Sequence, residues 1–168
     1  MKSRLVFKKG RIFFARHPSH VIAISKKVLR WLKPLSKKIE IAGSIRRREK
    51  TPFDIDIVLI PKDKNKIIEF LKTKGRFLQG GDKKASFKIK GVRVELYFTT
   101  PESWGATLLS YTGPFGSAIG LRILARKKGL LLNQYGLFNR KTKKFVFGKT
   151  EKEIYEALGK RYKPVWER

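Results

Sequence analysis

The stretch Gly43-Ser-Ile-Arg-Arg-Arg-Glu-Lys-Thr-Pro-Phe-Asp-Ile-Asp-Ile-Val-Leu-Ile60 decides how the rest of this chain is interpreted. It follows the apolar run Ile39–Ala42 and ends in an alternating segment, residues 54–60. If that segment is a β-strand, its period of two places Asp54 and Asp56 on one face and the aliphatic side chains on the other, toward a core. Two carboxylates about 7 Å apart repel each other, and a fold keeps such a pair most readily when a hard cation neutralises it.

The pattern Asp-x-Asp has a second interpretation, in which two solvated carboxylates stand on an edge strand. The surrounding sequence favours a site, because the strand is otherwise strongly apolar and is therefore expected to be central. Gly43-Ser44 ends the preceding strand, where small residues let backbone N–H groups approach a phosphate. The basic run Arg46-Arg47-Arg48 follows. Together these features predict a triphosphate site in which a metal ion bridges phosphate oxygens and carboxylates.

The composition indicates a polyanionic partner. The chain has 168 residues, enough for one or two small domains with a hydrophobic core. Its 41 Lys and Arg residues outnumber its 13 Asp and Glu residues, and the formal net charge is +28. Nucleic acid is the first candidate, because counterion release supplies most non-specific affinity. An anionic membrane surface or a hot or salty habitat are the alternatives.

Two absences narrow the chemistry. No stretch approaches 18 apolar residues and no segment resembles a signal peptide, so we expect no membrane association. The chain has no Cys, which excludes disulfides and thiolate metal sites. A metal would therefore be held by oxygen ligands, which favours Mg²⁺ or Mn²⁺.

Periodicity and turn residues predict an α+β fold, with a mixed β-sheet flanked by helices and then a small α/β C-terminal subdomain beyond a boundary near Thr107. The expected elements are a hairpin at 4–15, a helix at 18–33, strands at 39–42 and 54–60, a helix at 64–74, a strand at 76–78, a hairpin at 84–99, helices at 101–111 and 115–128, short strands within 130–138 and 144–147, and a capped helix at 154–158.

The second arm of the hairpin at 84–99 supplies a third acidic residue. Its alternation turns the apolar side chains toward the core and leaves Glu95 on the opposite face. If this arm lies beside residues 54–60, Glu95 joins Asp54 and Asp56. Alternatively, Glu95 pairs with Arg93 or with a lysine on a neighbouring strand.

Four motifs in chain order resemble the nucleotidyltransferase superfamily and, within it, the family X DNA polymerases. They are Gly43-Ser44-Ile45-Arg46-Arg47 with Asp54 and Asp56, the strand Val92–Phe98 with Glu95, the segment Tyr111-Thr112-Gly113, and Asn133–Phe138 with the closing helix at 151–158. The resemblance covers nearly the whole chain. It is greatest to the minimal viral form of the family, and it implies a nucleotidyltransferase palm at 1–106, a nucleotide- and template-contacting subdomain at 107–168, and no lyase activity.

The resemblance implies a template-directed DNA polymerase that adds dNTPs to a primer 3′-hydroxyl by two-metal transfer, in short-gap repair. The implied catalytic residues, which are also the ligands of two Mg²⁺ or Mn²⁺ ions, are Asp54, Asp56 and Glu95. The implied nucleotide-binding residues are Gly43, Ser44, Arg47, Tyr111, Thr112 and Gly113. The residues interpreted as DNA-binding are Arg46, Arg48, Lys50, Arg122, Arg126, Lys127 and Lys128.

The DNA-binding residues also have plainer interpretations. Arg46 and Arg48 could belong to a solvated turn, and the cations at 126–128 could simply stabilise a helix C-terminus. Three positions depart from the family pattern: Glu95 replaces Asp, Pro114 replaces Ser and Ala118 replaces Asn. The longer Glu95 side chain keeps its charge, so metal binding is expected to survive, and the loss of Asn at 118 bears on fidelity more than on activity.

Two other functions stay open at this point. One is a template-independent, small-molecule or RNA nucleotidyltransferase, and the other is a non-catalytic DNA-binding protein on a polymerase fold. The expected partners are dNTP and gapped or primer–template DNA, with an affinity that falls steeply with salt. We expect an intracellular monomer, cytoplasmic or nucleoid-associated, or carried in a virion if its source is a virus.

Overall fold

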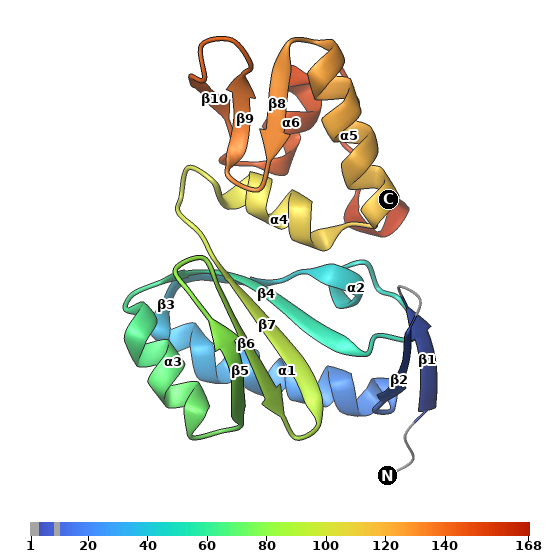
Figure 1. Ribbon diagram of the computed structural model, residues 1–168, viewed down its shortest axis with the longest axis vertical. Coiled ribbons are helices and arrows are strands. Elements are labelled where there is room, and N and C mark those ends of the chain that lie inside the picture. The colour runs from blue at the N-terminus through green and yellow to red at the C-terminus, as the bar shows by residue number, and fades with distance from the viewer. Residues whose placement is uncertain (1–3, 9–10) are drawn as a thin grey trace.

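A mixed five-stranded sheet forms the lower lobe of the computed structural model, which describes residues 4–8 and 11–168 (Figure 1). The strand order is β3-β4-β7-β6-β5, and only β4 and β7 run parallel. The strands are β3 (Ser36–Ile41), β4 (Asp54–Pro61), β5 (Arg76–Gly80), β6 (Lys84–Ile89) and β7 (Val92–Phe98). We call this lobe, with the helices and the hairpin described next, the palm lobe.

The helices of the palm lobe begin where the sequence predicts. Helix α1 (Pro18–Leu32) has proline in its first turn and the His17 side chain as its cap. Helix α3 (Lys64–Lys72) begins after Asp63, whose carboxylate accepts a 3.1 Å hydrogen bond from the Lys66 backbone N–H. The expected hairpin is also present, as β1 (Arg4–Lys8) paired antiparallel with β2 (Arg11–Ala15), whereas residues 9–10 of its expected turn lie outside the described residues.

The upper lobe, which we call the C-terminal lobe, combines helices with a three-stranded antiparallel sheet. Its elements are α4 (Trp104–Thr112), α5 (Phe115–Lys127), β8 (Leu130–Asn133), β9 (Gly136–Asn139), β10 (Phe145–Phe147), α6 (Glu151–Ala157) and the 3₁₀ turn η2 (Val165–Glu167). The predicted capping box is present, because Thr150 and Glu153 bond reciprocally at the start of α6. Helix α4 begins at Trp104, later than the predicted start at Pro101.

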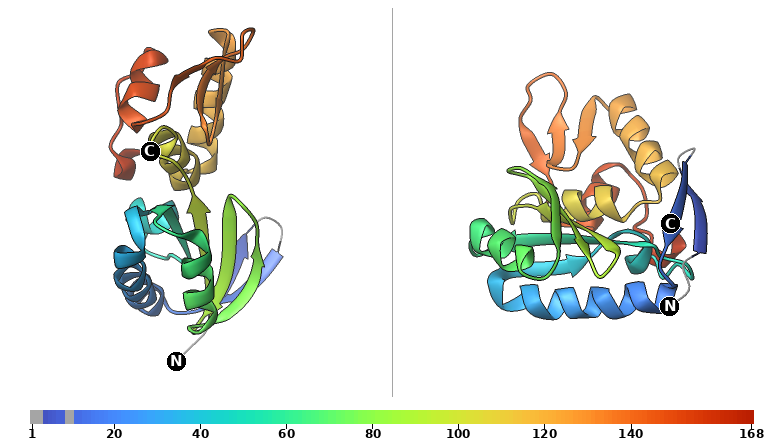
Figure 2. Two further views of the ribbon diagram at one scale, coloured as in Figure 1. Left: turned by 90° about the vertical axis from the view of Figure 1, so that its left-hand side faces the viewer. Right: turned by 60° about the horizontal axis from the view of Figure 1, so that its bottom comes forward.

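The two lobes meet along α4, which lies between them (Figure 2). Trp104 and Leu108 on α4 pack against Val58 and Tyr97 of the palm sheet, while Leu109 packs in the core of the C-terminal lobe. The predicted boundary near Thr107 therefore falls inside a helix that both lobes share, and the division at that residue stays a prediction.

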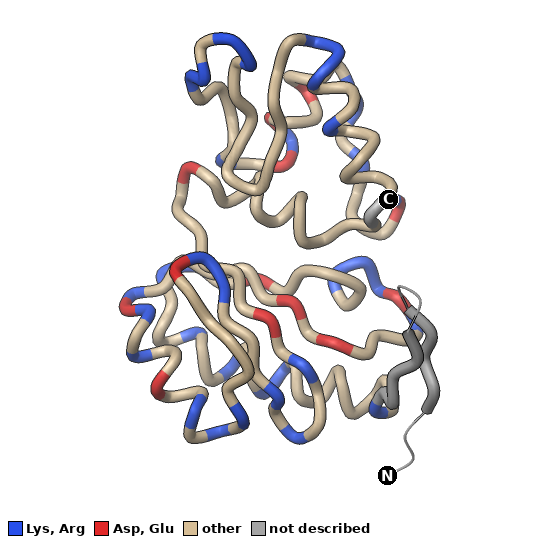
Figure 3. Tube along the Cα trace, viewed as in Figure 1, with Lys and Arg blue, Asp and Glu red and all other residues tan. Residues whose placement is uncertain are grey.

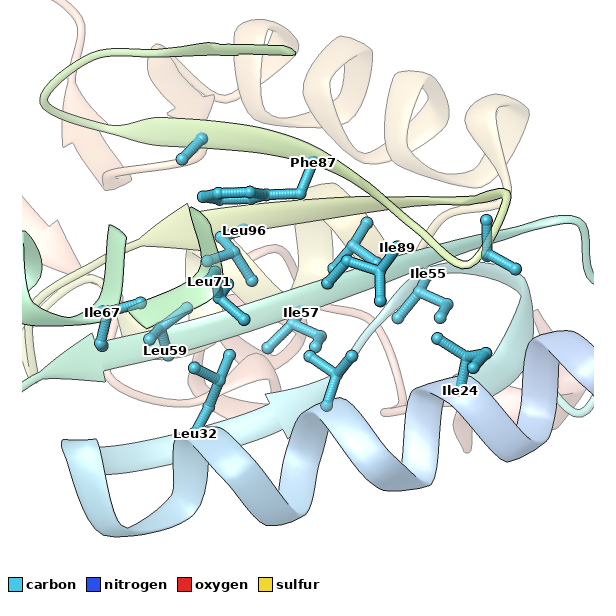
Figure 4. Close-up of a cluster of buried hydrophobic side chains, with 14 of the residues drawn as sticks. Ile24, Leu32, Ile55, Ile57, Leu59, Ile67, Leu71, Phe87, Ile89 and Leu96 are labelled. Carbon is cyan, nitrogen blue, oxygen red and sulfur yellow. The ribbon is translucent and has the colours of Figure 1, made fainter. Parts of the chain in front are cut away.

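The two faces of the palm sheet differ in chemistry. The central strands carry acidic positions with Lys and Arg positions around them (Figure 3), and strand alternation places these acidic residues on one face. The other face is covered by α1 and α3, and Figure 4 shows their side chains pointing at the sheet. Ile55, Ile57 and Leu59 are completely buried there, as the alternation predicted. Burying each such side chain contributes about 1.5–3 kcal/mol, so the core sets which face β4 presents.

Candidate active site

The Gly-Ser segment lies directly against the Asp-x-Asp strand. Residues Gly43–Arg46 form one helical turn, α2, where the sequence predicted a tight turn. Gly43 has a φ of +60°, and a Cβ atom there would lie 2.9 Å from Cγ of Asp56 and overlap its Oδ2. Only glycine fits this approach without a clash. The backbone of Gly43 and the carboxylate of Asp56 are therefore neighbours.

The parallel pairing of β4 with β7 brings Glu95 to the same place. Asp56 is in register with Glu95, and Asp54 is in register with Arg93. All these residues lie on the face opposite the core, because their neighbours along each strand are the buried ones. The expected adjacency of the two acidic strands is confirmed.

Tyr97 supports Asp56 from the side. Its hydroxyl donates a 3.2 Å hydrogen bond to Asp56 Oδ1, and its ring stacks on Tyr111 with the ring centroids 3.5 Å apart. Burial, and then the negative charges of Asp56 and Glu95, raise the pKa of Tyr97 well above its usual range. The phenol therefore keeps its proton and remains a donor to Asp56.

One oxygen of Glu95 is bound from β6, the neighbour of β7 on the side away from Asp56. Oε2 of Glu95 accepts a 2.8 Å hydrogen bond from Ser86 Oγ and lies 2.5 Å from Lys84 Nζ, while Oε1 lies 2.5 Å from Arg93 Nε. Burial acts to raise the pKa of Glu95, but the hydrogen bonds from Lys84, Ser86 and Arg93 lower it overall. Glu95 thus pairs both with Arg93 and with a lysine on the neighbouring strand, which are the two partners that the alternative interpretation of the sequence named.

A metal-binding cluster is not assembled in this arrangement. Across residues 4–8 and 11–168, no three His, Asp or Glu side chains are grouped so as to hold a metal ion. The strands that carry Asp54, Asp56 and Glu95 are adjacent, as expected. Their three side chains, however, are not grouped around one position. The physical reason is that Lys84, Ser86 and Arg93 already occupy both oxygens of Glu95.

The three acidic side chains nevertheless have the type of ligand atom that a divalent metal ion prefers. All three side chains offer carboxylate oxygens, the ligands that Mg²⁺ and Mn²⁺ prefer. Asp54 and Asp56 are both partly exposed. A bound cation would have to exchange places with at least one of the present partners of Glu95.

Ser44 presents a buried hydroxyl next to this face. Its Oγ is shielded from solvent and has no hydrogen-bond partner among the described residues. Leaving such a group unpaired costs about 1–3 kcal/mol, so the position fits an oxygen supplied by a ligand.

Arg46 is the last residue of α2, and it and the two arginines that follow it all contact the C-terminal lobe. Arg46 donates to both carboxylate oxygens of Glu151, Arg47 donates to the backbone carbonyl of Thr112, and the guanidinium of Arg48 lies 4.6 Å from the ring centroid of Trp166. The interpretation of Arg46 as part of a solvated turn is wrong, because only 14% of its side chain is exposed.

Arg46 is committed to protein partners through every nitrogen of its guanidinium. Nε donates to Glu40 at 2.9 Å, and Nη1 and Nη2 donate to Glu151 at 2.9 Å each. Arg168 also donates to Glu151, at 2.7 Å. Burial acts to raise the pKa of Glu151, but the hydrogen bonds from Arg46 and Arg168 lower it overall. The predicted contact of Arg46 with DNA phosphates stays a prediction and competes with this ion pair.

The segment Tyr111-Thr112-Gly113 closes the site from the C-terminal lobe. Thr112 is fully buried, and its hydroxyl accepts a 2.9 Å hydrogen bond from Arg46, so it contributes shape rather than a free side chain. Burial and the nearby Tyr135 raise the pKa of Tyr111, and the charge of Arg122 partly offsets this increase.

The remaining residues interpreted as DNA-binding are exposed. They are Arg48, Lys50, Arg122, Arg126, Lys127 and Lys128. Arg122 and Arg126 line a groove of about 550 Å³ between α5 and β8, whereas Lys127 lines a second groove on the other side of α5. In the described part of the chain, every helix is too short or too polar to span a bilayer.

Comparison with known proteins shows the family to which the chain belongs. A family model described as the DNA polymerase beta thumb matches residues 107–168. The chain is 32% identical over 142 residues to a repair DNA polymerase X of African swine fever virus, and the match covers 79% of this chain and 82% of the viral protein. This chain belongs to the family X DNA polymerases. This family X polymerase is a DNA-directed DNA polymerase, as the sequence motifs had predicted.

Other relatives match a shorter part of this family X polymerase. The human DNA-directed DNA/RNA polymerase mu is 36% identical over 90 residues, which are 53% of this chain and 18% of the human protein. The DNA nucleotidylexotransferase of Xenopus laevis is 32% identical over 80 residues, covering 47% of this chain and 16% of the frog protein.

Several residues that shape the polymerase site were not assigned from its sequence. The roles of Ser86 and Lys84 could have been found, because the tight hairpin at Lys90-Gly91 sets the register that pairs Ser86 with Glu95. Tyr97 shares the acidic face by alternation, but its bond to Asp56 depends on the neighbouring strand. No local signal marks Glu151 as the partner of Arg46, since 105 residues separate them.

Proposed function

We propose that this polymerase extends a DNA primer opposite a template strand, in short gaps during DNA repair, by nucleotidyl transfer with two divalent metal ions. The observation that carries the proposal is the register of β4 and β7, which places Glu95 next to Asp56 where Gly43 contacts the same carboxylate. The proposed role in repair is supported by the viral relative, which is named as a repair DNA polymerase. The proposal includes no lyase step.

Asp54, Asp56 and Glu95 would hold the two ions, Mg²⁺ or Mn²⁺. When bound, such ions stabilise the attacking and leaving oxygens of an in-line displacement. Tyr97 holds Asp56 in place through its hydroxyl. Glu95 is the group that we assign to accept the proton of the primer 3′-hydroxyl.

The triphosphate would lie over α2. Ser44 has a buried hydroxyl that lacks a partner among the described residues, and it would donate to a phosphate oxygen. Arg47 would bind the same group, since its carboxylate partner Glu49 is half exposed and can be displaced while Nη1 keeps its bond to the Thr112 carbonyl. Gly43 allows the close approach, and Tyr111, Thr112 and Gly113 shape the pocket for the sugar.

DNA would bind across the basic surface of both lobes. Arg122 would contact the template strand, and the proposed phosphate contacts are Arg48, Lys50, Arg126, Lys127 and Lys128. We leave Arg46 out of this set, because all three of its guanidinium nitrogens are engaged within the protein. We propose a monomeric enzyme that acts inside the cell, where its DNA substrate is.

Template-directed extension of a gapped duplex, tested with one dNTP at a time, examines this proposal. Asp54→Asn and Asp56→Asn are expected to lose roughly 10²–10³-fold in rate, because each removes charge stabilisation from the reacting centre. Asp82→Asn is the matched control, since Asp82 lies on an exposed turn with Lys64 as its partner. Near-parental extension by Asp56→Asn would reject the site.

The same assay separates the other functions. Equal extension with and without a template would favour template-independent transfer, which matters because one relative is named a DNA nucleotidylexotransferase. Ribonucleotides should be included, because another relative is named a DNA/RNA polymerase. Tight DNA binding by the parent protein without any extension would favour a non-catalytic DNA-binding role.

A further inference from the structure

Both oxygens of Glu95 are bound within the protein, and two of the three partners come from the strand on the far side from Asp56. Ser86 and Lys84 lie on β6 and approach Oε2, whereas Asp56 lies on β4 at the other side of β7. Ser86 stands directly opposite Glu95 in the ladder, and Lys84 stands opposite Tyr97. The β6 strand therefore holds Oε2 of Glu95 on the side of β7 that lies away from Asp56.

The three partners differ in how easily they can leave. Ser86 is completely buried and lies in the middle of a paired strand, so its hydroxyl stays where the backbone puts it. Lys84 is at the first residue of β6, and 41% of its side chain is exposed. Arg93, which binds the other oxygen, is 54% exposed and lies on β7, the same strand as Glu95. The Lys84 ammonium also lies 5.4 Å from the ring centroid of Tyr97, next to the bond that Tyr97 makes with Asp56. Lys84 is thus a partly exposed positive charge in contact with a carboxylate that is only 8% exposed.

We propose that Lys84 is a positioning residue, a built-in counter-ion that occupies Glu95 until a divalent metal displaces it. This inference rests on the proposed function, because it concerns the same acidic site. In the free protein the Lys84 ammonium neutralises Glu95 and holds Oε2 toward β6. On metal binding the ammonium moves into solvent, and the carboxylate turns toward Asp56. The exchange makes the affinity for the metal weaker than that of the bare carboxylates.

Direct metal binding without DNA or dNTP tests the proposal. Mn²⁺ can be titrated by electron paramagnetic resonance, which reports the free ion and does not depend on activity. Lys84→Met keeps the length of the side chain but removes its charge, and we expect it to bind Mn²⁺ about three- to tenfold more tightly. Lys84→Arg should behave as the parent protein does. Lys84→Gln provides a second neutral variant with the same expected direction.

Two controls isolate the effect on Glu95. Lys83→Met removes the same charge from the neighbouring residue, whose ammonium faces the Tyr135 ring instead, and it should leave the affinity unchanged. In a Glu95→Gln background, Lys84→Met should no longer tighten binding, because the carboxylate that it competes for is gone. Equal tightening in both backgrounds would show a general charge effect and overturn the proposal.

The outcomes distinguish this inference from the proposed function. If Mn²⁺ binding is lost in Asp56→Asn but unchanged in Lys84→Met, the metal site stands and the role of Lys84 is overturned. If Asp56→Asn and Glu95→Gln both bind Mn²⁺ as the parent does, the acidic site does not hold the metal, and both proposals are overturned. Tightening that requires Glu95 supports the exchange.

Discussion

Arg46 and Glu151 form a two-bond ion pair between the palm lobe and the C-terminal lobe, with Nη1–Oε1 and Nη2–Oε2 distances of 2.9 Å. Only 14% of the Arg46 side chain and 6% of the Glu151 side chain are exposed. Arg46 follows directly from the segment that contacts Asp56, so the position of the C-terminal lobe is tied to the acidic site. Because of this bridge, Arg46 of the basic run connects the two lobes instead of facing solvent.

Glu151→Gln should destabilise the protein by an amount on the order of 3 kcal/mol, because it leaves the buried Arg168 without its counter-charge and Arg46 with only the partly exposed Glu40. Urea unfolding followed by tryptophan fluorescence measures the change. Glu156→Gln is the matched control, since Glu156 lies on the same helix and makes only an exposed pair with Lys152. Equal stability of the two variants would show that the bridge contributes little.

The bridge also predicts a pH dependence. The pKa of Glu151 is lower in the folded protein than in the unfolded chain, so its stabilising contribution is complete above the ordinary Glu pKa of about 4.3. The contribution is lost as the pH falls through the lower folded value, because the unfolded chain takes up the proton first. The difference in unfolding free energy between the parent and Glu151→Gln should therefore shrink below that pH. A constant difference between pH 6 and strongly acidic solution, about pH 3, would contradict the assignment.

Gly43→Ala should impair both folding and catalysis. The added methyl group would overlap the carboxylate of Asp56, and the φ of +60° is unfavourable for alanine. We expect a loss of about 1–3 kcal/mol in stability and a loss of roughly 10²-fold in extension rate, as a displaced carboxylate misplaces the reacting groups. Gly81→Ala is the control, because a Cβ there would meet no atom within 4 Å.

Tyr97→Phe separates the hydroxyl of this residue from its ring. The variant keeps the stacking on Tyr111 but loses the hydrogen bond to Asp56. A hydrogen bond to a charged group contributes about 1.5–3 kcal/mol to stability, so we expect a lower melting temperature. Because Asp56 is then held less firmly, we also expect roughly a tenfold loss in kcat. Tyr111→Phe, which removes the hydroxyl of the stacked partner, should retain more activity. The idea fails if both variants lose the same rate.

DNA affinity should fall steeply with salt, because the proposed contacts are point charges on exposed side chains. Removing one phosphate contact, as in Arg126→Ala or Lys127→Ala, should reduce the slope of log affinity against log salt by about 1. Fluorescence anisotropy with a labelled gapped duplex measures this slope. Lys26→Ala on α1, which packs on the opposite face of the sheet, should leave it unchanged. A flat salt response of the parent protein would contradict the proposed mode of binding.

Local patterns accounted for most elements of the fold. Alternation along residues 54–60 and 92–98 predicted which side chains face the core under α1 and α3, because a one-residue shift would turn every side chain to the other face. Capping residues and prolines likewise predicted where α1, α3 and α6 begin. The short helical turn of α2 was missed, since four residues carry too little periodicity to distinguish a helix from a turn.

By itself, the sequence determined the chemistry available to this protein: three carboxylates at strand spacing, no thiols and an excess of 28 positive charges. Only the tertiary structure decided how those charges are shared. It paired Arg46 with Glu151 and enclosed Glu95 between Lys84, Ser86 and Arg93. The reason is physical: a buried carboxylate must be neutralised, and which cation reaches it depends on strand register and lobe packing, which bring together residues that are distant in the chain.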